Sequence, residues 1–590
     1  MFPLVSLLLI SLALSSSTNA ASAVDVGYAR YQGISDPATN ITSFLGIRYA
    51  APPTGTFRWR APQIPKKIEE VQLADTHGPA CFQGGLPTNL VSPFRPRADP
   101  EAPSEDCLFL EFAFSINAEA LLTSVCSVYT PNMKPKKLLP TLVWIHGGGY
   151  IIGSAQDYNG HDLVAAMDGS AVVVIVQYRL GLFGFLAGKQ VKNDGALNAG
   201  LLDQDFALRW VNKMIGNFGG DASRVTIWGQ SAGSSLCFIT AIFGSQLLQV
   251  LAQSCSTSLQ MAARRVLNSF LRPSPALPTV CNSIRTTTGF QRRAIALFAR
   301  LHLTDLQTIF ANVSAQAGCA NQRGLGCLRA LDASTLSAIN LNTMLQGFEG
   351  TTTFVPVIDG TFIRQSPTSA LLERKTNGDR LLAMANTNEG IIFVNQTVDY
   401  NVEDYVLQLF PTLGKEEAVE IAAAYSTLGS PVESATHILG EGRLIELILL
   451  GTGNNAKSVA MFICPAFLLA DSFRRTSYKG TFAIPPSLHG NDVVYYFRGF
   501  TGWPASPIFN NTDFITAFQQ GFFSFIVNHD PNRKLRSTVA PTWPLWGKGA
   551  KEMVFGSTDA GEPDIRVGAA DAGLLERCEL WKELREKTFQ

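Results

Sequence analysis

The five residues GQSAG at 229–233 constrain the fold of this chain strongly, because they connect two segments of different periodicity. The segment before them, SRVTIWG, is short, apolar and β-branched, as in a buried strand. The segment after them, SAGSSLCFITAIF, has the pattern of a helix. Small residues beside Ser231 let strand and helix approach closely and present the serine oxygen on a tight turn. A GxSxG sequence is frequent by chance in a glycine-rich chain, but this strand–turn–helix setting is the one in which it carries a nucleophile.

Apolar runs alternate with helical patterns from 138 to 240. LPTLVWI and AVVVIVQYRL are short and apolar throughout, which is typical of strands buried on both faces of a parallel sheet. NAGLLDQDFALRWVNKMIGNFGG at 198–220 is amphipathic, and Gly219 and Gly220 end it. This order of elements predicts an α/β fold with a large, mainly parallel central sheet flanked by helices.

The sequence HGGG at 146–149 follows the first of these strands. Attack on a carbonyl develops negative charge on its oxygen, which backbone N–H groups stabilise when they can approach closely. Glycines leave room for that approach. We therefore interpret HGGG as an oxyanion-stabilising loop, to which the amide of Ala232 would add a further donor, rather than as a flexible strand end.

A nucleophilic serine needs a base, and the base needs an acid that orients it. Their order along the chain in this kind of fold is serine, acid, histidine. Four histidines follow Ser231: His302, His437, His489 and His529. The first two lie in helical stretches, the last lies in the turn VNHDPN, and His489 lies in a loop that is predicted to enter the apolar strand VVYYF. Glu389 follows another short apolar strand, DRLLAMAN, so spacing favours Glu389 and His489 but leaves the choice open.

Nine stretches of the chain together resemble the type-B carboxylesterase/lipase family, which includes cholinesterases, fungal extracellular lipases and sterol esterases. They are FLGIRYAAPPTGTFRWRAP, SEDCLFL, LVWIHGGGY, YRLGLFGFLAG, GLLDQDFALRWV, FGGDASRVTIWGQSAG, NTNEG, HGNDVVYYF and ERCELW. They are spread over nearly the whole chain after its N-terminal segment. The resemblance implies a single α/β-hydrolase domain over residues 24–590.

The resemblance also implies roles for individual residues. By position, Ser231 corresponds to the nucleophile, Glu389 of NTNEG to the acid and His489 of HGND to the base. The oxyanion donors correspond to the amides of Gly148, Gly149 and Ala232. The chain departs from many relatives at Gln230, where they have glutamate, and this removes a negative charge beside the base.

The ten cysteines match no zinc-binding spacing and include no CxxC pair, so no metal is expected, and no cofactor. The resemblance implies three disulfides: Cys81–Cys107, Cys319–Cys327 and Cys464–Cys578. Four N-x-S/T sequons are predicted glycosylation sites: Asn40, Asn312, Asn395 and Asn510.

Residues 1–20 are predicted to form a signal peptide, with cleavage after Ala20 or Ala23. The apolar run from Leu4 to Leu14 is too short to span a bilayer, which needs roughly twenty residues. No later segment is long and apolar enough, so we expect a secreted, extracellular protein without an integral membrane segment. The 47 lysine and arginine residues equal the 47 aspartate and glutamate residues, which gives no reason to expect a nucleic-acid partner. The oligomeric state is not predicted.

The expected reaction is hydrolysis of a small ester or lipid through an acyl-enzyme. It requires a neutral imidazole, so activity is expected to fall below about pH 6.5. The loop at 82–106 contains five prolines, which forbid a long helical lid and favour a carboxylesterase with modest interfacial activation. The alternative is an interfacially activated triacylglycerol lipase or sterol esterase. A non-catalytic binding relative is disfavoured, because serine, acid and base are all retained.

Two segments depart from the family pattern. Residues 111–126 separate CLFL from SVYTP, which form one strand in the family, and a true insertion there is expected to break the strand ladder. We interpret this segment as the kind of sequence that an unspliced intron would encode. The second segment, at about 242–289, is interpreted as a loop insertion or as sequence foreign to the mature protein.

Overall fold

A computed structural model describes residues 19–85, 102–115, 137–234, 258–262, 307–320, 324–441, 462–473, 475–500 and 507–587. The lid residues 86–101 and His302 lie outside these ranges, as do most of the segments at 111–126 and 242–289.

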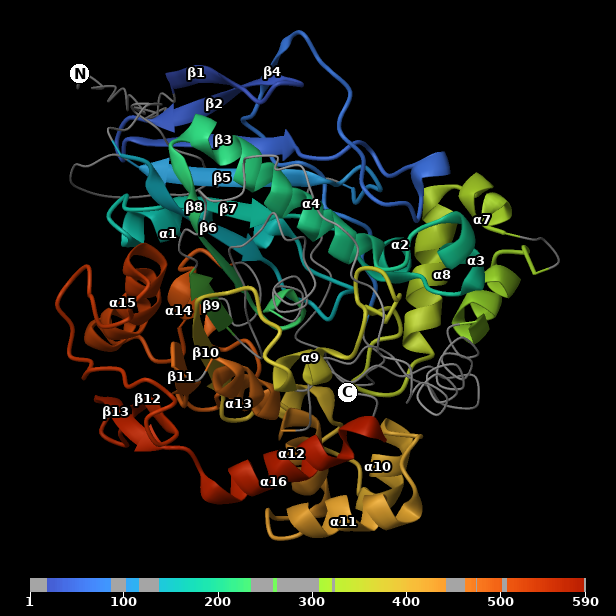
Figure 1. Cartoon of the computed structure of the whole chain (residues 1–590), viewed down its shortest axis with the longest axis vertical. Coiled ribbons are helices and arrows are strands. Elements are labelled where there is room, and N and C mark those ends of the chain that lie inside the picture. Colours follow the sequence, from blue (N-terminus) through green and yellow to red (C-terminus); the bar gives the residue numbers. More distant parts are fainter. Residues whose placement is uncertain are drawn as a thin grey trace, which may run out of the picture.

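The described strands form one sheet, which runs from the N-terminal strands at the top of Figure 1 to β12 and β13 at the lower left. Its order is β1-β2-β3-β5-β7-β6-β8-β9-β10-β11-β12-β13, with β4 beside β2. The strands are β1 (Asn19–Asp25), β2 (Arg30–Asp36), β3 (Ile41–Arg48), β4 (Val71–Leu73), β5 (Phe109–Ser115), β6 (Leu139–Ile145), β7 (Val172–Val176), β8 (Gly220–Gly229), β9 (Ser258–Ala262), β10 (Arg380–Asn386), β11 (Ser477–Phe482), β12 (Lys551–Ser557) and β13 (Pro563–Ala569).

The sheet is mixed, whereas the sequence predicted a mainly parallel one. Parallel pairing joins β7, β6 and β8 in one group and β10, β11 and β12 in another. The predicted apolar runs form these parallel strands, and all five residues of β7 are buried. The outer strands β1, β2, β3 and β5 pair antiparallel, as do β12 and β13. Short connections join β1 to β2, β2 to β3 and β12 to β13, and such connections allow only antiparallel neighbours. Strand β9 is also antiparallel to both of its neighbours.

The segment at 111–126 does not break the ladder where it begins. Strand β5 continues from Phe109 through Glu111 to Ser115, and its backbone pairs with both β3 and β7. The expected interruption at Glu111 is therefore wrong for the first five residues, because the inserted sequence itself supplies the strand. Residues 116–126 lie outside the described ranges.

The helices are α1 (Gly160–Ala166), α2 (Gly181–Phe185), α3 (Lys189–Asp194), α4 (Ala199–Met214), α7 (Gly326–Ala330), α8 (Ala333–Leu345), α9 (Pro367–Leu372), α10 (Val402–Leu409), α11 (Lys415–Tyr425), α12 (Pro431–Glu441), α13 (Ile463–Ser472), α14 (Val493–Tyr496), α15 (Thr512–Asn528) and α16 (Ala572–Glu583). The predicted amphipathic helix at 198–220 is α4 followed by a 3-10 turn that ends at Gly219. No helix in the described ranges combines the length and apolar character that crossing a membrane requires.

The prediction that VVYYF forms a strand is wrong. These residues form the short helix α14 and its C-terminal cap. The ring of Tyr496 packs edge-on against Trp228 of β8 and Phe522 of α15, with centroids 4.6 Å apart in each case. This packing outweighs the preference of valine and tyrosine for strands, which depends on context.

A second hydrophobic core lies apart from the sheet, where α10, α11, α12 and α16 gather at the bottom of Figure 1. We call these four helices the helical cluster. The indole N–H of Trp581 in α16 donates to the hydroxyl of Tyr425 in α11 at 2.8 Å. Arg577 of α16 forms two hydrogen bonds, of 2.6 and 2.8 Å, with the carboxylate of Glu441 in α12.

The three disulfides implied by the family resemblance are all present: Cys81–Cys107, Cys319–Cys327 and Cys464–Cys578. The last joins the start of α13 to α16 and so ties the helical cluster to the sheet.

The predicted sequons differ in setting. Asn40 and Asn510 are exposed and Asn395 is half-buried, whereas Asn312 stands in a helical stretch in which Ser314 is buried. Strand β1 includes both predicted cleavage positions, and its pairing with β2 is regular from Ala23 onward. Cleavage and glycosylation stay predictions.

Candidate active site

Ser231 stands on a sharp turn at the end of β8. Its φ of 54° is left-handed, a strained conformation for a residue with a side chain. A Cβ atom on Gly229 would lie 2.6 Å from the carbonyl carbon of Gly233, and one on Gly233 would lie 2.2 Å from Ile145 O. The two glycines of GQSAG are therefore required by close backbone contact, as predicted. A helix begins at Ala232, and Ser231 is 8% exposed.

The structure brings the three predicted side chains into one hydrogen-bonded chain. The imidazole Nδ1–H of His489 donates to Glu389 Oε2 at 2.6 Å. On the other side of the ring, Nε2 accepts from Ser231 Oγ at 2.8 Å. Both His489 and Glu389 are 1% exposed. The contacts fix which ring nitrogen carries the proton, and Nε2 is left as the proton acceptor for the serine.

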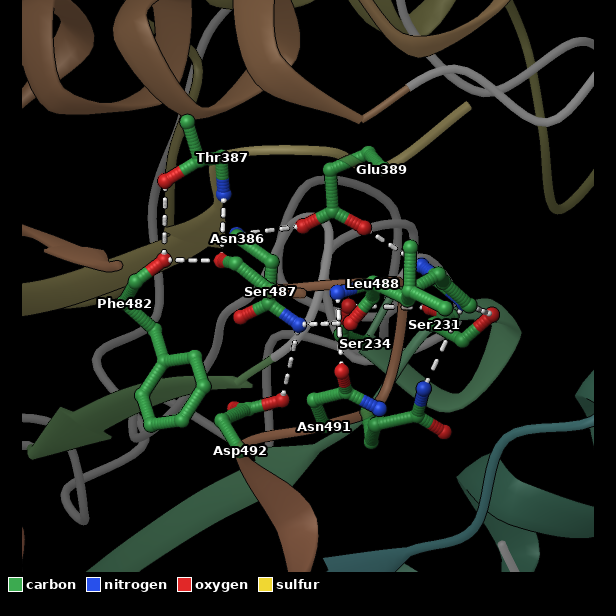
Figure 2. A network of polar contacts seen from close by, with 12 residues as sticks. Ser231, Ser234, Asn386, Thr387, Glu389, Phe482, Ser487, Leu488, Asn491 and Asp492 are labelled. Atoms are coloured by element: carbon green, nitrogen blue, oxygen red, sulfur yellow. Dashed lines mark hydrogen bonds and ion pairs between the residues drawn. The ribbon is translucent and has the colours of Figure 1, made fainter. Parts of the chain in front are cut away.

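Glu389 is held by the loop that follows β10, where Figure 2 shows its hydrogen bonds. The backbone N–H of Asn386 donates to Glu389 Oε1 at 2.5 Å, so each carboxylate oxygen has its own donor. The backbone N–H of Thr387 donates to Ser487 Oγ at 2.9 Å, and the Ser487 hydroxyl donates to Phe482 O at 2.5 Å. These bonds join the acid loop to the loop after β11.

His489 lies in that second loop, between β11 and α14. The backbone N–H of Leu488 donates to Asn491 Oδ1 at 2.9 Å, and the side-chain amide of Asn386 donates to Leu488 O. Two rings pack against the imidazole: Phe462, with centroids 4.2 Å apart, and Phe393, at 5.2 Å. Both rings belong to the hydrophobic core of the helical cluster.

The glycine loop begins directly after β6. Gly148 and Gly149 have φ values of 106° and 59°. A Cβ atom on Gly148 would lie 2.0 Å from Ile152 O, so only glycine fits there. Within the described part of the chain, the amides of Gly148 and Gly149 donate no hydrogen bond. Two backbone donors are therefore available near the end of β6.

His146, the first residue of this loop, is fully buried. Burial lowers its pKa from 6.5 to about 4, so the ring is neutral. Its Nδ1–H donates to Gly147 O at 2.9 Å, and the ring stacks on Tyr178 with centroids 4.5 Å apart. The Tyr178 hydroxyl in turn donates to His146 O at 2.9 Å. His146 and Tyr178 thus anchor the glycine loop.

The remaining histidines that were considered as bases lie elsewhere. His437 stands in α12, as its helical pattern predicted, with Nδ1 3.2 Å from Glu441 Oε1. His529 caps the C-terminus of α15 in a left-handed conformation. Neither contacts Ser231 in the structure.

Sequence reasoning missed the residues that support Glu389 and His489. Asn386 and Asn491 lie within the motifs NTNEG and HGND, so their positions were visible although their hydrogen bonds were not. Ser487 and Phe462 carry no sequence signal, because they meet the site only through folding. Among the described residues, no group of three His, Cys, Asp or Glu side chains is placed to hold a metal ion.

A mixed sheet flanked by helices, with a serine on the turn after a central strand and a histidine and an acid on later strand-end loops, defines the class of α/β-hydrolases. The model of the Carboxylesterase family matches residues 20–264 and 298–564, and the chain belongs to this family. The match leaves out 265–297, which overlaps the second segment that departs from the family pattern.

Several known proteins are similar over most of their length. The cocaine esterase of Homo sapiens is 31% identical, over 93% of this chain and 88% of the relative. The secreted triacylglycerol lipase LIP1 of Gibberella zeae is 28% identical, over 91% and 88%. The crystal structure of Aspergillus niger EstA has a TM-score of 0.70 and 26% identity, over 96% of this chain and 99% of that one. The chain is a carboxylic ester hydrolase.

Proposed function

We propose that Ser231, His489 and Glu389 hydrolyse carboxylic esters through a covalent acyl-enzyme. The observation that carries this assignment is the continuous chain of hydrogen bonds from Ser231 Oγ through the imidazole to Glu389. Ser231 Oγ attacks the ester carbonyl carbon and forms a bond to it, while its proton moves to His489 Nε2. Glu389 stays ionised and stabilises the imidazolium through Nδ1–H.

His489 next acts as a general acid, and then as a base again when water attacks. The tetrahedral intermediate collapses, the bond to the alcohol oxygen breaks, and Nε2–H gives its proton to the departing alkoxide. A water molecule then attacks the acyl-enzyme and passes a proton to Nε2. The second tetrahedral intermediate then collapses: the bond between Ser231 Oγ and the acyl carbon breaks, Nε2–H returns its proton to Oγ, and the carboxylic acid leaves.

The amides of Gly148, Gly149 and Ala232 are proposed to stabilise the charge on the carbonyl oxygen. The left-handed conformations of both glycines and the free amides of the loop support this role. Each well-placed donor contributes roughly 3 kcal/mol to transition-state stabilisation in comparable sites.

Replacing the nucleophile tests the assignment. We expect Ser231→Ala to lower kcat for p-nitrophenyl butyrate by at least about 10⁴-fold, with an unchanged melting temperature. Ser234→Ala is a matched control, because it removes a buried hydroxyl of the same turn, which donates to Ser231 O at 2.9 Å, and leaves Ser231 Oγ in place. We expect at most a few-fold loss there. Wild-type turnover in Ser231→Ala would exclude the mechanism.

We propose a carboxylesterase with modest interfacial activation. The family includes relatives named both as esterases and as lipases, and the proline-rich sequence between Cys81 and Cys107 supports the esterase side. Rates measured with tributyrin below and above its solubility limit decide the question. A smooth saturation curve is expected, and a sharp rise at the limit would identify an interfacial lipase.

Secretion after cleavage behind Ala20 or Ala23 is also proposed. The three disulfides and the similarity to relatives named as secreted lipases support it. Mass spectrometry of the protein from the culture medium of an expressing host should give an N-terminus at Ala21 or Val24.

A further inference from the structure

Gln230, which precedes the serine, contacts both the base and the glycine loop. Its side chain is almost completely buried, with the residue 5% exposed. Its amide nitrogen lies 3.4 Å from His489 Nε2. A Cβ atom on Gly147 would lie 2.1 Å from Gln230 Oε1, so the other end of the carboxamide rests against the start of the glycine loop.

The amide nitrogen points at the same ring atom that receives the proton of Ser231. His489 Nδ1–H donates to Glu389, so Nε2 has a single lone pair that faces both Ser231 Oγ and the Gln230 amide. An amide N–H can donate to that lone pair but cannot accept a proton from it. When Nε2 becomes protonated, its N–H faces a donor, and this opposes the imidazolium.

The charge of residue 230 matters because a carboxylate already faces the imidazole from the other side. Glu389 faces Nδ1 and already favours the imidazolium. Asp492, in the same loop as His489, accepts from the side-chain amide of Asn386 at 3.5 Å. His146, beyond Gly147, is neutral because burial lowers its pKa to about 4. A carboxylate at position 230 would add a second negative charge directly beside Nε2.

We propose that Gln230 is a positioning residue that keeps His489 Nε2 in its neutral, proton-accepting form at lower pH than a carboxylate at this position would allow. The proposal rests on the proposed catalytic function of Ser231 and His489. Its consequence is a pH–rate profile whose acid limb lies lower in this chain than in an otherwise identical enzyme with glutamate at 230.

The pH dependence of kcat/KM for p-nitrophenyl butyrate in Gln230→Glu tests this inference. An added carboxylate within hydrogen-bond reach stabilises the imidazolium, so the midpoint of the acid limb should rise by about one pH unit or more. Gln230→Met keeps the length and the neutrality of the side chain but removes the N–H donor. Its midpoint should rise by only about 0.3 to 0.5 units, because no charge is added.

Two results would overturn the inference: a Gln230→Glu midpoint equal to that of the wild type, or, if that variant does not fold, a Gln230→Met midpoint equal to it. The pH dependence of labelling by an organophosphonate should shift in parallel with hydrolysis, because the same imidazole activates the serine. A wild-type protein that the phosphonate does not label would contradict the proposed function itself, whereas equal midpoints in labelled enzymes contradict only the role of Gln230.

Discussion

Ser231 is positioned by backbone geometry at the end of β8, whereas Glu389 and His489 are positioned by side chains on two loops that border a second core. The serine turn needs only two glycines and a left-handed residue, all within five positions. The imidazole instead packs against Phe393 and Phe462, which belong to the hydrophobic core of the helical cluster.

The difference teaches that the two halves of the site respond to different parts of the chain. The nucleophile turn follows from local sequence and the central sheet, so remote changes should affect it little. Glu389 and His489 should instead be sensitive to the packing of the helical cluster and to the disulfide that anchors it. The following experiments separate the two halves.

Replacing the acid should disable the acid–base half while leaving the serine turn intact. In Glu389→Gln the new amide group would face His489 Nδ1 as a donor and favour the tautomer with the proton on Nε2. That tautomer cannot accept the serine proton, and we expect kcat to fall by about 10⁴-fold. Steady-state kinetics at pH 8 measure this loss in kcat. The control is Glu420→Gln, which neutralises an exposed carboxylate on α11. A loss below tenfold would contradict the role of Glu389.

Removing the Cys464–Cys578 disulfide should destabilise the helical cluster. The bond closes a separation of 114 residues, and chain entropy predicts a cost of about 4 to 5 kcal/mol for Cys464→Ala/Cys578→Ala. The control pair Cys319→Ala/Cys327→Ala opens a separation of only 8 residues, with about 2 to 3 kcal/mol expected. Urea denaturation measures both. Equal losses of unfolding free energy in the two variants would argue against coupling between the helical cluster and His489. So would an unchanged kcat for Cys464→Ala/Cys578→Ala close to its unfolding temperature.

The glycine loop should carry an acid-sensitive contribution to stability through His146. Its pKa is lowered in the folded state, so below the ordinary value of 6.5 the unfolded chain binds the additional proton. This contribution is fully present above pH 6.5 and is lost as the pH falls toward 4, by about 2 kcal/mol between pH 7 and 4.5. Urea denaturation at both pH values should show a smaller difference for His146→Asn than for the wild type. An identical difference would show that other groups carry the pH dependence.

The smallest effect is expected where the helical cluster touches the imidazole. Phe462→Leu removes the ring that packs 4.2 Å from His489, and we expect kcat/KM to fall about fivefold. Phe467 lies in the neighbouring helix α13, and its ring stacks on Trp546. We expect Phe467→Leu to lower the free energy of unfolding by a similar amount without the loss in kcat/KM. Equal kcat/KM in the two variants would show that Phe462 does not position His489.

The contrast between the locally determined serine turn and the two distant loops also explains which site residues could be predicted from the sequence. The serine turn was predicted because its determinants are contiguous: Gly229, Gly233 and the strand and helix around them. Glu389 and His489 could not be separated from other candidates by spacing, and only the resemblance to a family selected them. Their contact depends on a parallel register between β10 and β11, which brings residues 100 positions apart to 2.6 Å.

Two errors have the same origin. The residues of α14 have strand propensity, yet the aromatic surface of β8 and α15 folds them into a helix. The residues from Glu111 to Ser115 have no place in the family pattern, yet they satisfy the open edges of β3 and β7. In both places tertiary partners decide the local structure.

The bond between Cys464 and Cys578 also sets an order of events during biosynthesis. The nucleophile turn and the central strands leave the ribosome long before Cys578, which follows Cys464 by 114 residues. The rings beside the imidazole therefore gain their anchor only after α16 has been made and has met an oxidising compartment. Complete packing around His489 is therefore expected only in the full-length, oxidised chain.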